Sequence, residues 1–240
     1  MRILLFDIDG TLIHAAGAGR RALLAALQGA FEVPEPRCEI NFSGQTDGYI
    51  FTQALLQNRL PATAENLRRL IDHYLQILPH WLEQCSGVVL PGVVSLLGRL
   101  QQVPGIHLSC MTGNLASAAR LKLQHFGLWD GYFDGPHLFT GDDCQQRDQM
   151  ARAAAARLAA SFEGIELDLW VIGDTPRDVR CARAMGARVL ACCTGQHSRD
   201  EMAACQPDHL FDDLSDVSTI ADILCGDRHR RQPAPLVVTP

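Results

Sequence analysis

Residues 1–12, MRILLFDIDGTL, decide the fold of this chain. An unbroken apolar run, residues 3–6, leads directly to Asp7 and Asp9, and a Gly-Thr pair follows. A short apolar run that ends at a glycine turn is typical of a strand buried on both faces in a parallel sheet. Because side chains two positions apart on a strand share a face, we expect Asp7 and Asp9 to project together. Carboxylates held so close repel each other, so the pattern favours a bound cation or a shared proton.

Two other interpretations of these residues stay open at this point. The first is a plain acidic turn after a strand, which needs no ligand. The second is a calcium loop, although the later oxygen ligands and the distal glutamate of an EF-hand are missing from the sequence after Asp9. The rest of the chain is needed to choose among them.

The composition is that of an ordinary globular protein with an acidic balance. The chain has 240 residues, of which 47% are hydrophobic and 20% charged, and a net charge of −6. This length suffices for one large domain or two unequal ones, and the charge gives no reason to expect a nucleic-acid partner. No stretch approaches the roughly 20 apolar residues of a membrane span, and no signal architecture precedes Asp7, so we expect no membrane partner. Nine irregularly spaced cysteines without a Cys-x-x-Cys pair indicate reduced thiols and a cytoplasmic location.

A helical stretch interrupts the strand pattern directly after residues 1–12. Apolar residues at helical spacing predict helices over 17–31, 47–57 and 63–84. No strand-like run occurs between His14 and Gly87. We therefore predict a small all-helical domain, residues 14–87, inserted into a larger domain made of residues 1–13 and 88–225. The proline-containing residues 226–240 have no packing period and are predicted to be a disordered tail.

Strands and helices alternate in the second half of the chain. The expected strands are 106–111, 132–139, 167–172, 187–192 and a short one near residue 210. The expected helices are 93–102, 114–126 with Asn114 as its N-cap, 146–160, 177–185, one from about residue 198, and 217–224. This alternation predicts an α/β fold with a doubly wound parallel sheet and right-handed crossovers.

The predicted strands end in small polar residues at three places. These ends are Asp7–Thr11, Thr112–Asn114 and Gly173–Asp178. Ligands of open parallel sheets bind beyond the carboxyl ends of the strands, so the three segments are expected to share one edge. The carboxylates of Asp7, Asp9, Asp174 and Asp178 could then surround one hard cation, and such an oxygen-only set suits Mg²⁺. Thr112 and the N–H groups of the helix behind it suit phosphate oxygens.

Together these segments resemble the motifs of the haloacid dehalogenase-like superfamily of hydrolases, particularly its phosphatases of the phosphoglycolate phosphatase type. DIDGT at 7–11 resembles the first motif, Thr112 the second and GDTPRD at 173–178 the fourth. The insert at 14–87 lies where that family has its helical cap, and the resemblance covers about residues 2–224.

The resemblance implies a role for each matched residue. Asp7 is the expected nucleophile, which forms an aspartyl-phosphate, and Asp9 the expected general acid and base. Mg²⁺ is expected on Asp7, the backbone carbonyl of Asp9 and Asp174, with Asp178 nearby. The remaining expected substrate contacts in these motifs are Gly10, Gly113 and Asn114.

The third motif of that family, usually a lysine, has no lysine counterpart here. Of the 21 basic residues only Lys122 is a lysine, and it is interpreted as a solvated surface charge on the helix after Thr112. Arg147 stands near the expected place, and an arginine keeps the charge with a fork suited to phosphate. We expect Arg147 to be the catalytic cation, with Arg152 as the weaker candidate.

Residues 42–47, FSGQTD, resemble the substrate-specificity loop of the family's cap, which makes Gln45 and Thr46 candidates for contacting the leaving group. The alternative is an ordinary turn in which Thr46 or Asp47 caps the next helix. The expected function is a Mg²⁺-dependent phosphatase for a small phosphorylated metabolite, acting as a monomer or homodimer. A phosphomutase on the same scaffold and a catalytically silent binding module remain alternatives.

Overall fold

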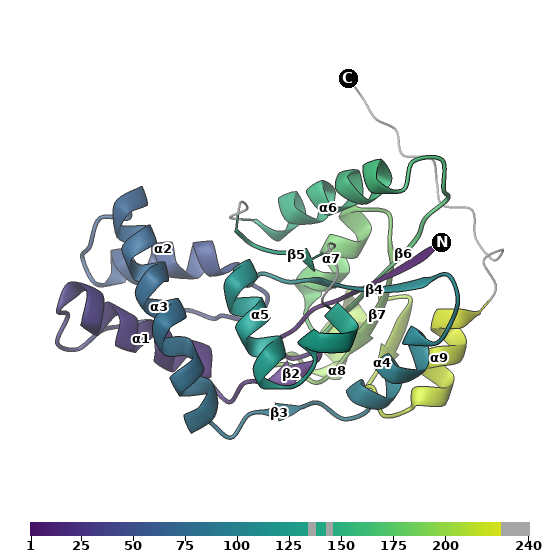
Figure 1. Cartoon of the computed structure of the whole chain (residues 1–240), viewed down its shortest axis with the longest axis horizontal. Coiled ribbons are helices and arrows are strands. Elements are labelled where there is room, and N and C mark those ends of the chain that lie inside the picture. The colour runs from purple at the N-terminus through teal and green to yellow at the C-terminus, as the bar shows by residue number, and fades with distance from the viewer. Residues whose placement is uncertain (134–137, 143–145, 227–240) are drawn as a thin grey trace.

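A parallel β-sheet forms the centre of the computed structural model, which describes residues 1–133, 138–142 and 146–226 (Figure 1). The sheet has six strands in the order β5-β4-β1-β6-β7-β8. These are β1 (Arg2–Phe6), β4 (Ile106–Met111), β5 (Leu138–Phe139), β6 (Asp168–Gly173), β7 (Arg188–Cys192) and β8 (His209–Phe211). Helices cover both faces, so the predicted α/β class with a doubly wound parallel sheet is confirmed.

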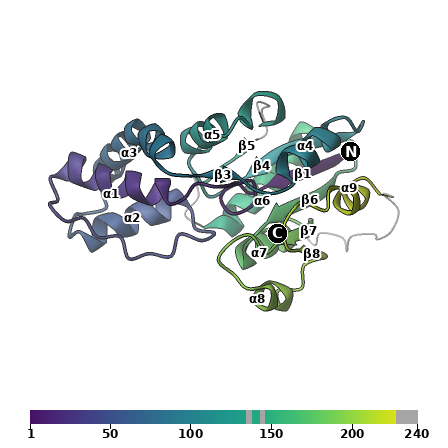
Figure 2. The same cartoon turned by 90° about the horizontal axis from the view of Figure 1, so that it is seen from below.

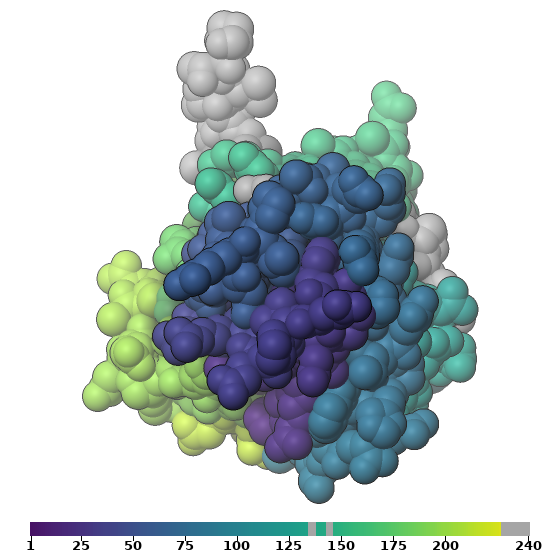
Figure 3. Space-filling view, turned by 90° about the vertical axis from the view of Figure 1, so that its left-hand side faces the viewer, coloured from purple at the N-terminus to yellow at the C-terminus, as the bar shows by residue number. Residues whose placement is uncertain are grey.

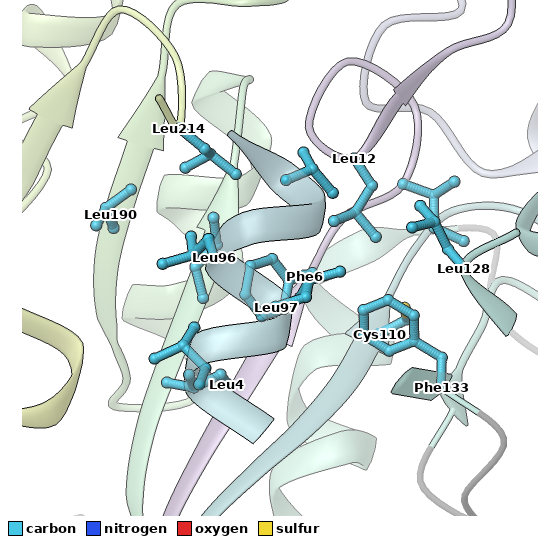
Figure 4. Close-up of a cluster of buried hydrophobic side chains, with 14 of the residues drawn as sticks. Leu4, Phe6, Leu12, Leu96, Leu97, Cys110, Leu128, Phe133, Leu190 and Leu214 are labelled. Atoms are coloured by element: carbon cyan, nitrogen blue, oxygen red, sulfur yellow. The ribbon is translucent and has the colours of Figure 1, made fainter. Parts of the chain in front are cut away.

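Alternating side chains of the strands divide the core of the sheet into two clusters. Leu4 and Phe6 of β1 point to one face, and Ile3 and Leu5 point to the other. The first face is covered by α4 (Val93–Gln101), α5 (Ala116–His125) and α9 (Val217–Cys225). The second is covered by α6 (Arg147–Ser161), α7 (Pro176–Ala184) and α8 (Arg199–Ala204). Figure 4 shows Phe6 inside the first cluster. The strand buried on both faces, expected from the apolar run, is therefore present.

The helical insert forms a bundle with its own apolar core at one end of the sheet (Figure 2). It consists of α1 (Ala18–Phe31), α2 (Asp47–Gln57) and α3 (Ala64–Gln84), and Figure 3 looks onto its outer face. Thr63 caps α3 by accepting a hydrogen bond from the backbone N of Asn66 at 3.2 Å. The antiparallel pair β2 (Ile13–His14) and β3 (Val88–Val89) lies where the chain enters and leaves the insert. The expected helical insert after the first strand is thus present, and its division from the core at residues 14 and 87 stays a prediction.

Two local predictions need correction. Of the strand expected over 132–139, residues 138–139 form the short strand β5, whereas residues 132–133 belong to a π-helical turn, η1 (Trp129–Phe133), and residues 134–137 lie outside the described part. Gly131, directly before the expected strand, has a φ of 108°, so the chain turns there. Helix α5 begins at Ala116 with Leu115 as its N-cap, because the Asn114 side chain is engaged elsewhere.

The described helices contain none that is both long and apolar enough to cross a membrane. The predicted tail lies outside the described residues, except for Gly226. Its disorder therefore stays a prediction.

Candidate active site

The central position of β1 brings the three polar strand ends to one place. Phe6 at the end of β1 pairs with Cys110 of β4 on one side and with Ile172 of β6 on the other. The next residues on these strands therefore leave the same edge of the sheet. They place Asp7 between Thr112 and Asp174.

A buried acidic triad forms at this edge. Single carboxylate oxygens of Asp7, Asp174 and Asp178 all lie within 4.8 Å of one another. Thr11 Oγ1 donates to Asp174 Oδ1 at 2.9 Å, and the Thr175 hydroxyl donates to Asp178 Oδ2 at 2.6 Å. These bonds orient the carboxylates toward each other.

The electrostatics of the triad call for positive charge. Burial raises the pKa of Asp7 to about 6, against the opposing effect of Arg147. Burial, followed by the neighbouring carboxylates of Asp178 and Asp7, raises the pKa of Asp174 well above its ordinary value. A cation close to these oxygens would lower both pKa values, because it favours the charged carboxylates and offsets their mutual repulsion.

Glycines leave space for the carboxylate in the middle of this triad. Gly10 has a φ of 88°, and a Cβ there would lie 2.4 Å from Asp174 Oδ2. A Cβ on Gly195 would lie 1.9 Å from the same oxygen. The Asp174 carboxylate is therefore surrounded closely by backbone, in a buried set of oxygen donors. Such a donor set fits a hard divalent cation, so the triad could bind a metal ion.

Asp9 lies outside the triad, although it lines the same cavity as Asp7 and its charge is among those that raise the pKa of Asp7. Strand β1 ends at Phe6, and the chain then turns, with Leu12 N and Ile13 N donating to Ile8 O at 2.9 and 3.0 Å. The alternation of a strand no longer applies beyond that point. Only the backbone carbonyl of Asp9 therefore remains a candidate metal ligand.

The Asp9 carboxylate pairs with Lys122 instead. Asp9 Oδ2 accepts from Lys122 Nζ at 2.6 Å and from Asn114 Nδ2 at 2.8 Å. Lys122 Nζ also donates to Asn114 Oδ1 at 2.6 Å, which closes a three-membered network.

The interpretation of Lys122 as a surface charge is wrong, because its side chain is only 6% exposed. Lys122 lies on the buried face of α5 together with Ala118, Ala119 and Leu123. The helical period from Ala118 to Lys122 was the sequence signal that could have shown this.

Arg147 reaches the triad from the first position of α6. Its side chain is buried, with NH1 donating to Asp7 Oδ2 at 3.3 Å and NH2 donating to Asp178 Oδ1 at 2.5 Å. Burial lowers the pKa of the guanidinium, but the Asp178 and Asp7 carboxylates outweigh this and raise it above its ordinary value. Arg152, the weaker candidate, is exposed. The structure thus places Arg147 against the triad and Lys122 against Asp9.

Thr112 and Asn114 lie between these two charged groups. Asn114 Nδ2 donates to Thr112 Oγ1 at 2.7 Å as well as to Asp9. The first N–H groups of α5, expected to face phosphate, are already engaged with carboxylates. Leu115 N donates to Asp47 Oδ2 at 2.8 Å, and Ala116 N donates to Asp142 Oδ2 at 2.7 Å.

The loop 42–47 of the insert docks on the core beside this site. Asp47 N donates to Gly113 O at 2.8 Å, and a Cβ on Gly113 would lie 2.1 Å from Gln45 O. On the other side of the loop, Arg177 NH1 donates to Ser43 O at 2.9 Å. Contacts on both sides therefore hold the loop over the carboxyl ends of the strands.

Gln45 and Thr46 occupy different environments in this loop. The buried Thr46 hydroxyl accepts from Tyr49 N at 3.3 Å and caps α2, as in the alternative interpretation of an ordinary helix-preceding turn. Gln45 is half-buried and lines a cavity.

This cavity, of about 580 Å³, lies between the helical insert and the edge of the sheet. Most of the expected site residues line it: Asp7, Asp9, Gly10, Gln45, Thr112, Gly113, Asn114, Arg147 and Asp174. Asp178 and Thr46 do not line it. Lys122, Phe42 and Tyr74 add to its wall. The structure therefore gathers acids, the cations Arg20, Lys122 and Arg147, and an apolar wall around one space.

Comparison with known proteins identifies the class to which this arrangement belongs. The sequence model of the haloacid dehalogenase-like hydrolase family matches residues 4–183. The phosphoglycolate phosphatase of Rhodospirillum rubrum is 30% identical over 226 residues, covering 90% of this chain and 89% of that protein. The probable phosphatase IndB of Dickeya dadantii is 28% identical over 228 residues, covering 92% and 94%. The chain belongs to the haloacid dehalogenase-like hydrolase family.

Solved structures show the same fold. A predicted phosphoglycolate phosphatase from Haemophilus somnus superposes with a TM-score of 0.67 at 19% identity, over 91% of this chain and 96% of that one. CbbY from Rhodobacter sphaeroides, in complex with phosphate, gives 0.64 at 18% identity, over 90% and 95%. The family match and the curated phosphatases confirm the expected enzyme class, a phosphoric monoester hydrolase.

Proposed function

We propose that this enzyme is a Mg²⁺-dependent phosphatase that hydrolyses a small phosphorylated metabolite through an aspartyl-phosphate on Asp7. The observation that carries the proposal is the pairing of the buried Asp7 carboxylate with Arg147 at 3.3 Å, in a triad within 4.8 Å, on a cavity of about 580 Å³. A buried carboxylate at such a cavity can act as a nucleophile where water is largely excluded.

In the first displacement, an oxygen of Asp7 attacks the phosphorus. The bond between phosphorus and the leaving oxygen breaks, and Asp9 gives its proton to that oxygen. Arg147 offsets negative charge on the phosphoryl oxygens with a planar fork of donors. The Thr112 hydroxyl already accepts from Asn114, so its own hydrogen can be donated to a phosphoryl oxygen.

In the second displacement, water attacks the phosphorus of the aspartyl-phosphate. Asp9, now a carboxylate, accepts a proton from this water, and the bond between Asp7 and phosphorus breaks to release inorganic phosphate. Mg²⁺ held by Asp7, Asp174 and the backbone carbonyl of Asp9, with Asp178 nearby, would supply further neutralisation of the phosphoryl charge. Asp7 and Asp9 therefore return to their starting states.

The leaving group of the substrate occupies the part of the cavity beside the insert. We propose that Gln45 contacts it, because Gln45 lines the cavity from the docked loop. Curated relatives named phosphoglycolate phosphatase support a small phosphorylated metabolite as the substrate class.

Phosphate release from a panel of phosphorylated metabolites tests the proposal. Wild type should release phosphate with Mg²⁺ and lose that activity with a chelator, and Asp7→Asn should be inactive while retaining its circular dichroism spectrum. Turnover by the Asp7→Asn variant would refute the covalent step. An isomerised sugar phosphate without phosphate release would point to a phosphomutase, and binding without any turnover to a silent module.

A further inference from the structure

Lys122 has no place in the residues matched to the family motifs, yet it is the buried cation that touches Asp9. Its Nζ lies 2.6 Å from Asp9 Oδ2 and 2.6 Å from Asn114 Oδ1. A buried ammonium is costly unless it is paired and hydrogen-bonded, and both partners here belong to the catalytic edge of the sheet. We propose that Lys122 is a positioning residue that aims Asp9 at the leaving group, an inference that rests on the proposed phosphatase function.

The hydrogen bonds divide the two oxygens of Asp9 between two tasks. Oδ2 is held by Lys122 Nζ at 2.6 Å and Asn114 Nδ2 at 2.8 Å. Among the described residues, none donates a hydrogen bond to Oδ1, and the Asp9 side chain is 41% exposed beside the cavity. Oδ1 is therefore the oxygen available to carry the proton that the leaving group needs.

Lys122 also provides a charge partner at the moment of proton transfer. When Oδ1 gives its proton to the leaving oxygen, Asp9 becomes a carboxylate next to the ammonium of Lys122. That product of the transfer is stabilised by an ion pair with the buried ammonium of Lys122. The same carboxylate is then in place to accept a proton from the attacking water.

Arg147 and Lys122 therefore have different tasks in the site. Arg147 touches Asp7 and Asp178, on the side where the phosphoryl group binds, at 3.3 and 2.5 Å. Lys122 touches Asp9, on the side where the leaving group departs. Loss of Lys122 should accordingly impair proton donation, whereas loss of Arg147 should impair every phosphoryl transfer.

The leaving-group dependence of the rate provides the test. Glycerol phosphate has an alkoxide leaving group that needs a proton, whereas p-nitrophenyl phosphate has an acidic phenol that leaves without one. Steady-state kcat and KM are measured on both esters for wild type, Lys122→Met, Lys122→Arg and Asp9→Asn. Arg152→Met, an exposed arginine on α6, is the matched control.

Lys122→Met should lower kcat for glycerol phosphate about 10- to 100-fold more than for p-nitrophenyl phosphate, since general acid catalysis is worth about 10²–10⁴. Asp9→Asn should show the same pattern more strongly, and Lys122→Arg should recover part of the loss. Arg152→Met should match wild type on both esters. Circular dichroism and thermal unfolding check that each variant folds.

An equal loss on both esters, or no loss on either, would overturn the role of Lys122. If Lys122→Met does not fold, Lys122→Arg is the deciding variant. Its displaced charge should still lower kcat more for glycerol phosphate than for p-nitrophenyl phosphate, and an equal loss on both esters would overturn the inference. If wild type hydrolyses neither ester nor any compound of the metabolite panel, the proposed phosphatase function itself fails. The two failures are therefore distinguishable.

Discussion

Replacing Arg147 with methionine should be severe for both activity and stability. The variant keeps most of the side-chain volume but leaves Asp7 and Asp178 without the guanidinium that now lies 3.3 and 2.5 Å away. Removal of one partner from a buried ion pair costs about 3–5 kcal/mol of folding free energy. In a domain of this size, roughly 2–4 °C of melting temperature corresponds to each kcal/mol, so we expect a drop of roughly 6–20 °C.

The effect of the same substitution on turnover has a separate origin. A preorganised donor that faces developing negative charge contributes about 10²–10³ in kcat. Arg147→Met should therefore lose about that factor on glycerol phosphate and on p-nitrophenyl phosphate alike, because both esters transfer the same phosphoryl group. Arg147→Lys should recover part of the rate, since the charge remains but the planar fork is lost.

Thermal unfolding and steady-state kinetics on four proteins measure these effects: wild type, Arg147→Met, Arg147→Lys and the exposed control Arg152→Met. Added Mg²⁺ should raise the melting temperature of Arg147→Met by mass action, which separates the loss of charge from a general folding defect. An Arg147→Met enzyme with wild-type kcat and melting temperature would refute the reasoning. So would an Arg152→Met enzyme with the greater loss.

Three further predictions concern the metal, the substrate and pH. Asp174→Ala should raise the Mg²⁺ concentration needed for activity or abolish activity, and Mg²⁺ should no longer raise the melting temperature of this variant. Full activity of chelator-treated wild type would show that the metal assignment is wrong. Gln45→Ala should change the relative rates among substrates of different leaving groups, whereas unchanged ratios across the panel would exclude Gln45 from substrate selection. Burial raises the pKa of Asp47 from 3.8 to about 6, although Lys122 and the Leu115 N–H oppose this. The folded protein therefore holds the Asp47 proton more tightly than the unfolded chain does. The resulting contribution to stability is complete below about pH 4 and is lost as pH rises through about 6. Between pH 4 and 7 the free energy of unfolding of wild type should therefore fall by up to about 3 kcal/mol more than that of Asp47→Asn, measured by urea unfolding with a chelator present. An equal pH dependence of variant and wild type would contradict this.

Much of this fold can be predicted from patterns that belong to single elements. The apolar run at residues 3–6 indicates a doubly buried strand whatever its neighbours are, and β1 is such a strand. The helices of the insert follow from the spacing of apolar residues, and Thr63 caps α3 as its position suggests. Of the strand predicted over 132–139, the end at 138–139 is confirmed as β5 and the start at 132–133 is wrong, because these residues belong to the turn η1.

For the candidate site, too, local patterns predict some residues and miss the contacts made between distant segments. The aspartates of the strand ends could be named because each follows an apolar run, and the order of the strands brings Asp7 beside Asp174. The helical period from Ala118 places Lys122 on the buried face of α5, but its partner Asp9 cannot be named from the sequence, because no pattern within one segment says which residue a helix face meets. The Asn114 side chain, expected to cap α5, hydrogen-bonds to Asp9 for a similar reason.

The sequence by itself therefore determined the class of fold, the helical insert and the acidic residues of the candidate site, since the periods of strands and helices and the order of motifs are local properties. Only the tertiary structure decided that Asp9 pairs with Lys122, that Arg147 spans Asp7 and Asp178, and that loop 42–47 docks on Gly113. These contacts join residues 31 to 140 positions apart, as Arg147 does with Asp178 and Asp7. They depend on how helices pack against the ends of the sheet, where the low dielectric of the interior makes each buried charge find a partner.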